Sequence, residues 1–268
     1  MTAPDDHALD DPAVDGCRVD DHALAADLAR RTGELLVGLL GDAAASRGRR
    51  IDAMGDRVAH PFLVRGLARH RPDDAVLSEE GQDDPARLDS DRVWILDPLD
   101  GSSDFGWSGQ WSVHVGLSEK GLAVAGAVAV PALGATYATN PPAGPVMSRV
   151  GGRPVALVAR SRRHIDGRLL VEGLDADVLA VGSAGVKAMA VVRGEADLYL
   201  HGGGMYEWDS CAPAAVAMAA GLHASRLDGS PLRFNRPDPW APGLVICRRE
   251  LADDLLGLLG RAMGRTGA

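Results

Sequence analysis

The sequence predicts an α/β protein with two lobes, and three observations support this class. Short apolar stretches that suit strands alternate with longer stretches in which apolar residues recur at helical spacing. A segment rich in Pro and Gly, residues 140–155, interrupts the chain near its middle. The length of 268 residues, 46% of them hydrophobic, allows two lobes that share a core. We therefore expect a disordered acidic tail over 1–20, an N-terminal α+β lobe over 21–150 and a C-terminal α/β lobe over 151–268.

The N-terminal lobe is predicted to start with helices and to continue as a sheet. Leucines recur on one face of residues 21–40, which indicates an amphipathic helix. Asp56 is the expected N-cap of a second helix, in which Pro61 requires a late start or a kink. The expected strands of this lobe cover residues 74–78 and 92–96, a hairpin over 111–133 that turns at Glu119–Gly121, and residues 135–139.

The C-terminal lobe is predicted to alternate strands with helices. The expected strands cover residues 155–161, 179–184 and 196–201. The expected helices cover residues 165–173, 185–193 and 210–220, the last opened by Asp209 and stopped by Gly221.

Composition excludes several classes of protein. A net charge of −9 repels phosphate backbones, so we expect no nucleic-acid partner. Residues 121–138 are the one apolar run that could suggest a membrane span, but Pro131 and several Gly residues favour two buried strands. The acidic N-terminus lacks the features of a signal peptide. Three widely spaced Cys residues indicate free thiols, so we expect a cytoplasmic protein without a membrane partner.

Acidic residues follow two predicted strands at the point where each strand ends. Glu79 and Glu80 follow the first strand. Asp97 and Asp100 follow the second, with Pro98 fixing the backbone between them. If the two strands are neighbours, these carboxylates meet at one edge of the sheet. Like charges about 5 Å apart repel by roughly 3 kcal/mol at an effective dielectric constant near 20, so such a cluster either takes up protons or binds cations.

The ligand types and the following loop indicate the ion and its substrate. Oxygen ligands without His or Cys suit Mg²⁺ or Mn²⁺. The backbone N–H groups of Gly101, Ser102 and Ser103 can form a cradle for an anion. Bound Mg²⁺ beside such a cradle predicts a phosphate ligand.

Each acidic residue also has an ordinary structural interpretation. Asp97 and Asp100 suit turns in which the carboxylate bonds its own backbone, and Asp209 suits a helix cap. Glu79 and Glu80 suit a solvated pair. None of these alternatives accounts for all the acids together.

Three stretches of the sequence resemble the signature of a known family. The stretches "LSEE" (77–80), "WILDPLDGSSDF" (94–105) and "WDSCAPAAVAMAAG" (208–221) are similar to the signature of the inositol monophosphatase superfamily of Mg²⁺-dependent, lithium-sensitive phosphatases. The resemblance covers about residues 21–247. Within the superfamily the chain is most similar to bacterial 3'-phosphoadenosine 5'-phosphate phosphatases of the CysQ type, which serve sulfate assimilation. Asp104, where inositol monophosphatases usually carry Asn, supports this finer match, and Ser102 departs from the usual Thr.

The resemblance implies a layered αβαβα sandwich with two or three Mg²⁺ ions, with Mn²⁺ as an alternative, and inhibition by Li⁺. It implies the following metal ligands: Glu79, Asp97, the Leu99 carbonyl, Asp100 and Asp209. It makes Glu79, Ser102 and Asp56 the catalytic residues, with Asp56 serving a third ion. It also implies these substrate contacts: Gly101, Ser102, Ser103, Gly182, Ser183, Lys187 and Asp209. Relatives are often homodimers.

The activity implied is hydrolysis of 3'-phosphoadenosine 5'-phosphate, a small phosphate ester, to AMP and phosphate. Two alternatives stay open: a phosphatase for inositol monophosphate or fructose 1,6-bisphosphate, and a sensor that binds Mg²⁺ and nucleotide without catalysis. Lys187 suits either a second phosphate or solvent. Likewise, His201, Tyr206 and Trp208 suit either stacking on adenine or the core.

Overall fold

The computed structural model describes residues 19–45, 51–142, 152–162 and 166–266. Almost all of the predicted tail, and the predicted lobe boundary near residue 150, lie outside these residues.

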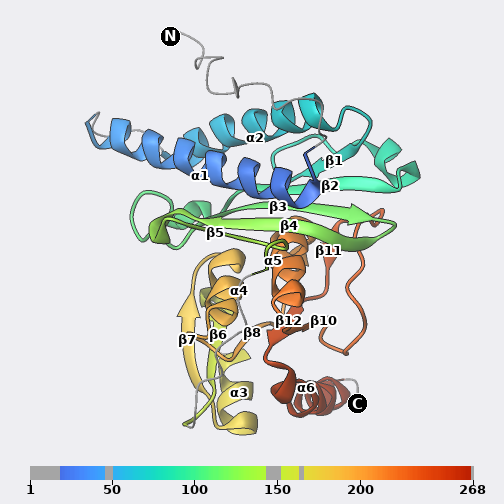
Figure 1. Ribbon diagram of the computed structural model, residues 1–268. Helices are drawn as coiled ribbons and strands as arrows, with labels where there is room; N and C mark the ends of the chain where they lie inside the picture. The colour runs from blue at the N-terminus through green and yellow to red at the C-terminus, as the bar shows by residue number, and fades with distance from the viewer. Residues whose placement is uncertain (1–18, 46–50, 143–151, 163–165, 267–268) are drawn as a thin grey trace.

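The described residues form five layers, in which helices and sheets alternate (Figure 1). Helices α1 and α2 cover the outer face of the first sheet, α4 and α5 lie between the two sheets, and α3 and α6 lie on the far side of the second sheet. The predicted αβαβα order is thereby confirmed. The helices are α1 (Asp21–Ala45), α2 (Ile51–His70), α3 (Asp166–Leu174), α4 (Ala184–Val192), α5 (Glu207–Ala219) and α6 (Ala252–Thr266).

The first sheet has the strand order β1-β2-β3-β4-β5. Strands β1 and β2 are parallel, as the convergence of their acids requires, and the remaining neighbours are antiparallel. The apolar run 121–138 forms β4 and β5, as predicted, and no helix of the described residues is long and apolar enough to cross a membrane. The strands are β1 (Ala75–Ser78), β2 (Arg92–Asp100), β3 (Ser112–Glu119), β4 (Leu122–Val130) and β5 (Ala135–Ala138).

The second sheet has the strand order β10-β12-β8-β6-β7, and a separate two-stranded ribbon joins β9 to β11. Strands β6, β7 and β8 run parallel, which fits the predicted alternation of strands and helices. The strands are β6 (Val155–Ala159), β7 (Asp177–Val181), β8 (Leu198–His201), β9 (Met205–Tyr206), β10 (His223–Ser225), β11 (Trp240–Ala241) and β12 (Leu244–Cys247).

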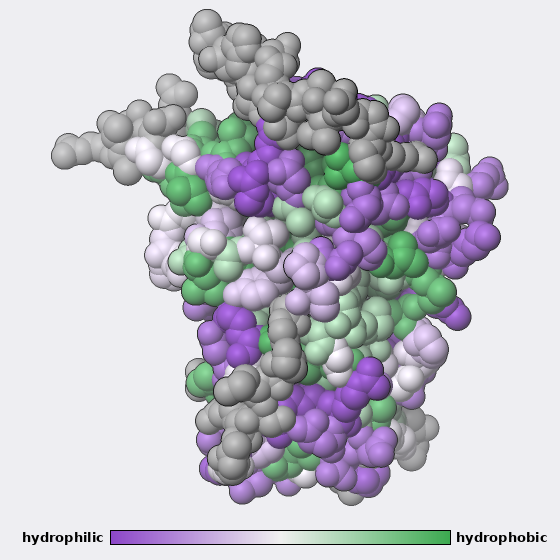
Figure 2. Space-filling view, in the orientation of Figure 1, coloured by the Kyte–Doolittle hydropathy of each residue, from purple (hydrophilic) through white to green (hydrophobic). Residues whose placement is uncertain are grey.

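Three apolar cores correspond to the spaces between the layers. Leu28 and Leu63 lie between the first helical layer and the first sheet, Met189 and Val216 lie between the two sheets, and Leu170 and Leu255 lie beneath the second sheet. The outer surface is mixed: on the face in Figure 2, hydrophobic residues form small patches among hydrophilic ones.

Three predictions about individual elements are wrong. Helix α5 begins at Glu207, so Asp209 lies in its first turn and does not open the helix. Helix α2 begins at Ile51, so Asp56 lies inside the helix and is not its N-cap, and Pro61 is also accommodated within the helix. Strand β2 does not stop before the acids but continues to Asp100, with a register irregularity between Asp97 and Asp100. The sequence did not predict helix α6 or strands β9, β10, β11 and β12.

Candidate metal centre

Carboxylates from β2 and α5 meet at the junction between the first sheet and the central helices. One carboxylate oxygen from each of Asp97, Asp100 and Asp209 lies within 4.8 Å of the others. Glu79 follows β1, and its N–H donates a hydrogen bond to the Leu96 carbonyl at 3.2 Å. The Glu79 and Asp97 carboxyl groups share a hydrogen bond, which brings the fourth acid to the cluster.

Small residues in the first sheet allow α5 to approach closely enough to deliver Asp209. A Cβ atom at Gly116 would lie 2.8 Å from the Cys211 Sγ, and one at Gly126 would lie 3.2 Å from the Ala212 Cα. Larger side chains would therefore push the helix away. Cys211 is buried in this contact, and burial raises the pKa of its thiol, so it is unsuited to act as a nucleophile.

Three of the four clustered carboxylates resist ionisation. Burial, followed by the charges of Asp100 and Glu79, holds the pKa of Asp97 well above its ordinary value. Burial and the charge of Asp100 raise the pKa of Asp209 to about 7. Glu79 lies at the exposed edge, yet partial burial and neighbouring acids still raise its pKa. A divalent cation would relieve this repulsion, and the all-oxygen donor set fits Mg²⁺ or Mn²⁺.

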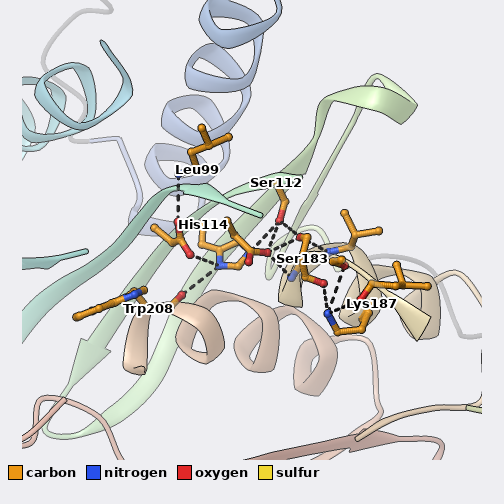
Figure 3. A network of polar contacts seen from close by, with 12 residues as sticks. Leu99, Ser112, His114, Ser183, Lys187 and Trp208 are labelled. Atoms are coloured by element: carbon orange, nitrogen blue, oxygen red, sulfur yellow. Dashed lines mark hydrogen bonds and ion pairs between the residues drawn. The ribbon is translucent and has the colours of Figure 1, made fainter. Parts of the chain in front are cut away.

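Asp100 is held by groups from β3 and from the start of α4. Figure 3 shows Ser112, His114 and Ser183 meeting at this point. Its Oδ2 accepts hydrogen bonds from the Ser112 Oγ at 2.9 Å and from the Gly185 N–H at 2.9 Å, and also from the Ser183 Oγ. The His114 Nε2 lies 3.2 Å from the same oxygen. Burial would raise the pKa of Asp100, but His114 and the other donors outweigh burial and lower it.

His114 is a residue of the site that the sequence reasoning missed. It is fully buried, and its Nδ1 donates to the Trp208 carbonyl at 3.1 Å while its Nε2 faces Asp100. Burial acts to lower the pKa of His114, but the Asp100 carboxylate reverses the effect and raises it. A signal was present: Ser112 and His114 lie two residues apart in an apolar strand, so their side chains share one face.

The Gly101–Ser103 loop lies beside the acids and forms the start of a short 3₁₀ helix, Ser102–Asp104. Gly101 has a φ of +84°, and a Cβ atom there would lie 2.7 Å from the Gln110 carbonyl oxygen. Only Gly fits this conformation and this contact without strain. Asp104 is buried and accepts a hydrogen bond from Arg160 at 2.6 Å, which ties the loop to the segment after β6.

The predicted substrate contacts in the turn before α4 have their side chains turned inward. Besides Asp100, the Ser183 Oγ contacts the Ser112 Oγ at 2.8 Å and accepts from the Val186 N–H at 3.1 Å. Lys187 is buried, and its Nζ donates to three carbonyls, those of Val181, Gly182 and Ser183, at 3.2, 3.3 and 2.5 Å (Figure 3). The interpretation of Lys187 as a solvated side chain is therefore wrong.

The remaining predicted residues surround the cluster. Asp56, in α2, is close enough for its charge to raise the pKa of Glu79. The N–H of Leu99 donates to the Asp97 Oδ1 at 3.1 Å, so Asp97 bonds its own backbone as well as joining the acid cluster. Trp208 and His201 are partly buried, while Tyr206 is exposed.

Comparisons with known proteins agree with this geometry. The family model described as "Inositol monophosphatase family" matches residues 23–261. The chain is 46% identical over 255 residues to the 3'-phosphoadenosine 5'-phosphate phosphatase of Mycobacterium leprae, with 89% of this chain and 93% of that protein covered. It is 48% identical over 217 residues to the Mycobacterium tuberculosis protein of the same name, with coverage of 78% and 81%.

A solved structure shows the same fold. The CysQ protein of Bacteroides thetaiotaomicron, a bacterial member of the inositol monophosphatase family, superposes with a TM-score of 0.69 at 24% identity, over 84% of this chain and 96% of that chain. The chain described here belongs to the inositol monophosphatase family.

Proposed function

We propose that the protein is a Mg²⁺-dependent phosphomonoesterase that hydrolyses 3'-phosphoadenosine 5'-phosphate to AMP and phosphate. The observation that carries the proposal is the convergence of Asp97, Asp100 and Asp209 within 4.8 Å, next to the Gly101 turn and with Glu79 hydrogen bonded to Asp97. The choice of substrate is supported by two mycobacterial relatives of that name at 46% and 48% identity. The resemblance at Asp104, where inositol monophosphatases usually carry Asn, favours the nucleotide over the inositol or fructose phosphate alternative.

The chain's own residues position the ester and move the proton. The ligands proposed for the ions are Glu79, Asp97, the Leu99 carbonyl, Asp100 and Asp209, with Asp56 serving a third, weaker ion. Backbone N–H groups of Gly101, Ser102 and Ser103 would hold the phosphate. Ser102 and Glu79 would orient the attacking water and accept its proton, because the Glu79 carboxylate lies at the open edge of the cluster. When bound, Mg²⁺ supplies positive charge that makes water more acidic and stabilises the departing 3'-oxygen.

The inward side chains of the α4 turn change one part of the assignment. The Ser183 hydroxyl and the Lys187 ammonium are engaged within the protein, so we propose that they shape the turn. The Gly182 N–H and carbonyl are engaged as well, with the Gln110 Oε1 and the Lys187 Nζ, so the turn is proposed to shape the site rather than to bind the substrate. The protein is proposed to act in the cytoplasm, in sulfate assimilation, with inhibition by Li⁺ and as a homodimer.

Phosphate release from a panel of esters tests the proposal. The purified chain is assayed with 3'-phosphoadenosine 5'-phosphate, inositol monophosphate and fructose 1,6-bisphosphate, with Mg²⁺ titrated and with or without Li⁺. We expect the nucleotide to have the highest kcat/KM, no turnover without Mg²⁺, and inhibition by Li⁺. Faster hydrolysis of either sugar phosphate would favour the alternative phosphatase. Binding without any release would favour the sensor.

A further inference from the structure

Two exposed aromatic residues lie opposite each other across the two-stranded ribbon whose strand β9 precedes α5. Tyr206 and Trp240 are direct partners across the β9–β11 ribbon, and they are 45% and 46% exposed. The Tyr206 ring stacks on Trp208, with ring centroids 4.6 Å apart and planes 6° from parallel. One face of the Tyr206 ring is thus supported from within the protein.

The backbone that presents these rings is fixed by a buried acid. Glu207 has no exposed surface, and its carboxylate accepts the N–H groups of Asn235 and Arg236 at 2.6 and 3.0 Å. Its own N–H donates to the Pro239 carbonyl at 2.9 Å, one residue before Trp240. These bonds tie the chain that carries Trp240 to the first residue of α5.

The Trp240 ring also packs against the backbone of Gly204. A Cβ atom at Gly204 would lie 2.3 Å from the indole ring, so the ring lies directly against the Gly204 backbone. The His201 Nε2 lies 3.2 Å from the carbonyl of Gly204, which anchors that backbone in turn. Both rings are therefore ordered in advance of any ligand, and this lowers the entropic cost of stacking on them.

The two rings adjoin the metal centre. The Tyr206 N–H donates to the Asp209 Oδ2 at 2.7 Å, so the ring and the carboxylate belong to one turn of backbone. A phosphate ester held at Asp209 would therefore lie beside the turn of backbone that carries the Tyr206 ring. Nucleobases stack on exposed aromatic rings, whereas inositol and sugar phosphates have no planar group to stack.

We propose that Tyr206 and Trp240 form a platform on which the nucleobase of the substrate stacks, and that this platform makes the site selective for nucleotides. The proposal rests on the proposed nucleotide phosphatase function and assigns the subsite that recognises the base.

Equilibrium binding of AMP tests the platform separately from turnover. The variants are Trp240→Ala and Tyr206→Leu, with Trp240→Phe as the conservative change and Leu179→Ala, an exposed apolar residue of β7, as the matched control. We expect Trp240→Ala and Tyr206→Leu to weaken AMP binding by about tenfold or more, the loss measured when a stacking ring is removed. Trp240→Phe and Leu179→Ala should bind AMP as wild type does. Mg²⁺ affinity, measured by calorimetry, should be the same in all five proteins.

The KM for 3'-phosphoadenosine 5'-phosphate should rise in parallel, with kcat little changed. Wild-type affinity for AMP in both truncation variants, or no AMP binding by the wild type, would overturn the platform. An equal loss of Mg²⁺ and AMP affinity would overturn it too, because that result indicates a disturbed helix start. If AMP binds through the platform and no nucleotide is hydrolysed, the proposed function fails and the platform stands.

Discussion

At the scale of single residues, the carboxylate of Asp209 lowers the free energy of unfolding of the metal-free protein. Its pKa of about 7, raised first by burial and then by Asp100, means that ionising it in the metal-free fold is unfavourable. The ordinary value is 3.8. A carboxyl group with a raised pKa in the folded state destabilises the fold progressively as pH rises between these two values, and fully above the higher one.

We predict that Asp209→Asn stabilises the metal-free protein and removes its activity. The Asn side-chain oxygen can still accept the Tyr206 N–H, while the charge is lost. In EDTA at pH 8 the free energy of unfolding should rise by about 1–4 kcal/mol, and the gain should disappear near pH 4. Turnover with Mg²⁺ should fall by more than about 100-fold, because even groups that only support metal ligands contribute 10–100-fold. Equal denaturation midpoints of variant and wild type at pH 8 would contradict the electrostatic argument.

For Lys187 the structure indicates a structural role, whereas the sequence predicted a contact with the substrate. Burial lowers its pKa to about 8, against the opposing charges of Asp100 and Asp209, and its three donors face carbonyls. We predict that Lys187→Ala reduces the free energy of unfolding by about 1–3 kcal/mol, because buried acceptors lose their donor. The KM values for the bisphosphorylated nucleotide and for inositol phosphate should change by the same factor. A selective rise for the nucleotide would instead show that Lys187 reaches the second phosphate.

The acids of the site could be predicted from the sequence, but the groups that orient them could not. Carboxylates at strand ends carry a pattern that is visible in the chain. His114 and Ser112 act on Asp100 only because β3 pairs with β2 in a register that aligns Asp100 with Ser112. That register depends on the shift in strand pairing between Asp97 and Asp100, which no local sequence pattern predicts.

At the scale of elements, the start of α4 donates hydrogen bonds to Asp100 and so holds one acid of the candidate metal centre. Ser183 is the N-cap of α4, and its φ of +54° is unusual for a residue with a side chain. Its hydroxyl joins Asp100, Ser112 and the Val186 N–H. The helix thus presents both a hydroxyl and the Gly185 N–H to one carboxylate oxygen.

We predict that Ser183→Ala weakens Mg²⁺ binding by about 10–100-fold, as expected for loss of a group that orients a ligand. The free energy of unfolding should fall by about 1–2 kcal/mol through loss of the cap. Calorimetric titration with Mg²⁺ and chemical denaturation measure the two effects. Ser230→Ala, at an exposed turn, serves as the control and should change neither. An unchanged Mg²⁺ titration in Ser183→Ala would show that the other donors suffice to hold Asp100.

The helices and strands themselves were largely predictable, and the errors have physical causes. Apolar runs located β3 and β4, which are buried on both faces over most of their length, and apolar periodicity located α1, which buries one stripe. The predicted start of α2 is too late because Asp56 is a plausible N-cap residue, whereas the helix begins at Ile51. It also continues through Pro61, where Phe62 and Leu63 pack in the first core. Tertiary burial outweighed local preference there.

At the scale of the whole molecule, the site is built where separate layers meet. The first sheet contributes Asp97 and Asp100, while the central layer contributes Asp209 and the α4 turn. The meeting of Glu79 with Asp97 was predictable on the condition that β1 and β2 are neighbours, and the structure shows that they are. The approach of α5 was not, because it depends on Gly116 and Gly126 facing Cys211 and Ala212 across the core.

A cation bound at this junction should stabilise the whole fold. Mg²⁺ would bind the folded cluster far better than the unfolded chain, where the acids are dispersed. At 100 times its dissociation constant, a ligand adds about 2.7 kcal/mol to the free energy of unfolding. For a chain of this size each 1 kcal/mol corresponds to roughly 2–4 °C in Tm, so we expect a rise of roughly 5–11 °C. Thermal unfolding with Mg²⁺, compared with NaCl at equal ionic strength, measures the shift.

The Asp209→Asn variant should lose most of this rise in Tm, because one ligand is gone and the repulsion that Mg²⁺ relieves is already reduced. A wild-type Tm that does not respond to Mg²⁺, or an equal response in Asp209→Asn, would mean that the clustered acids do not hold the ion.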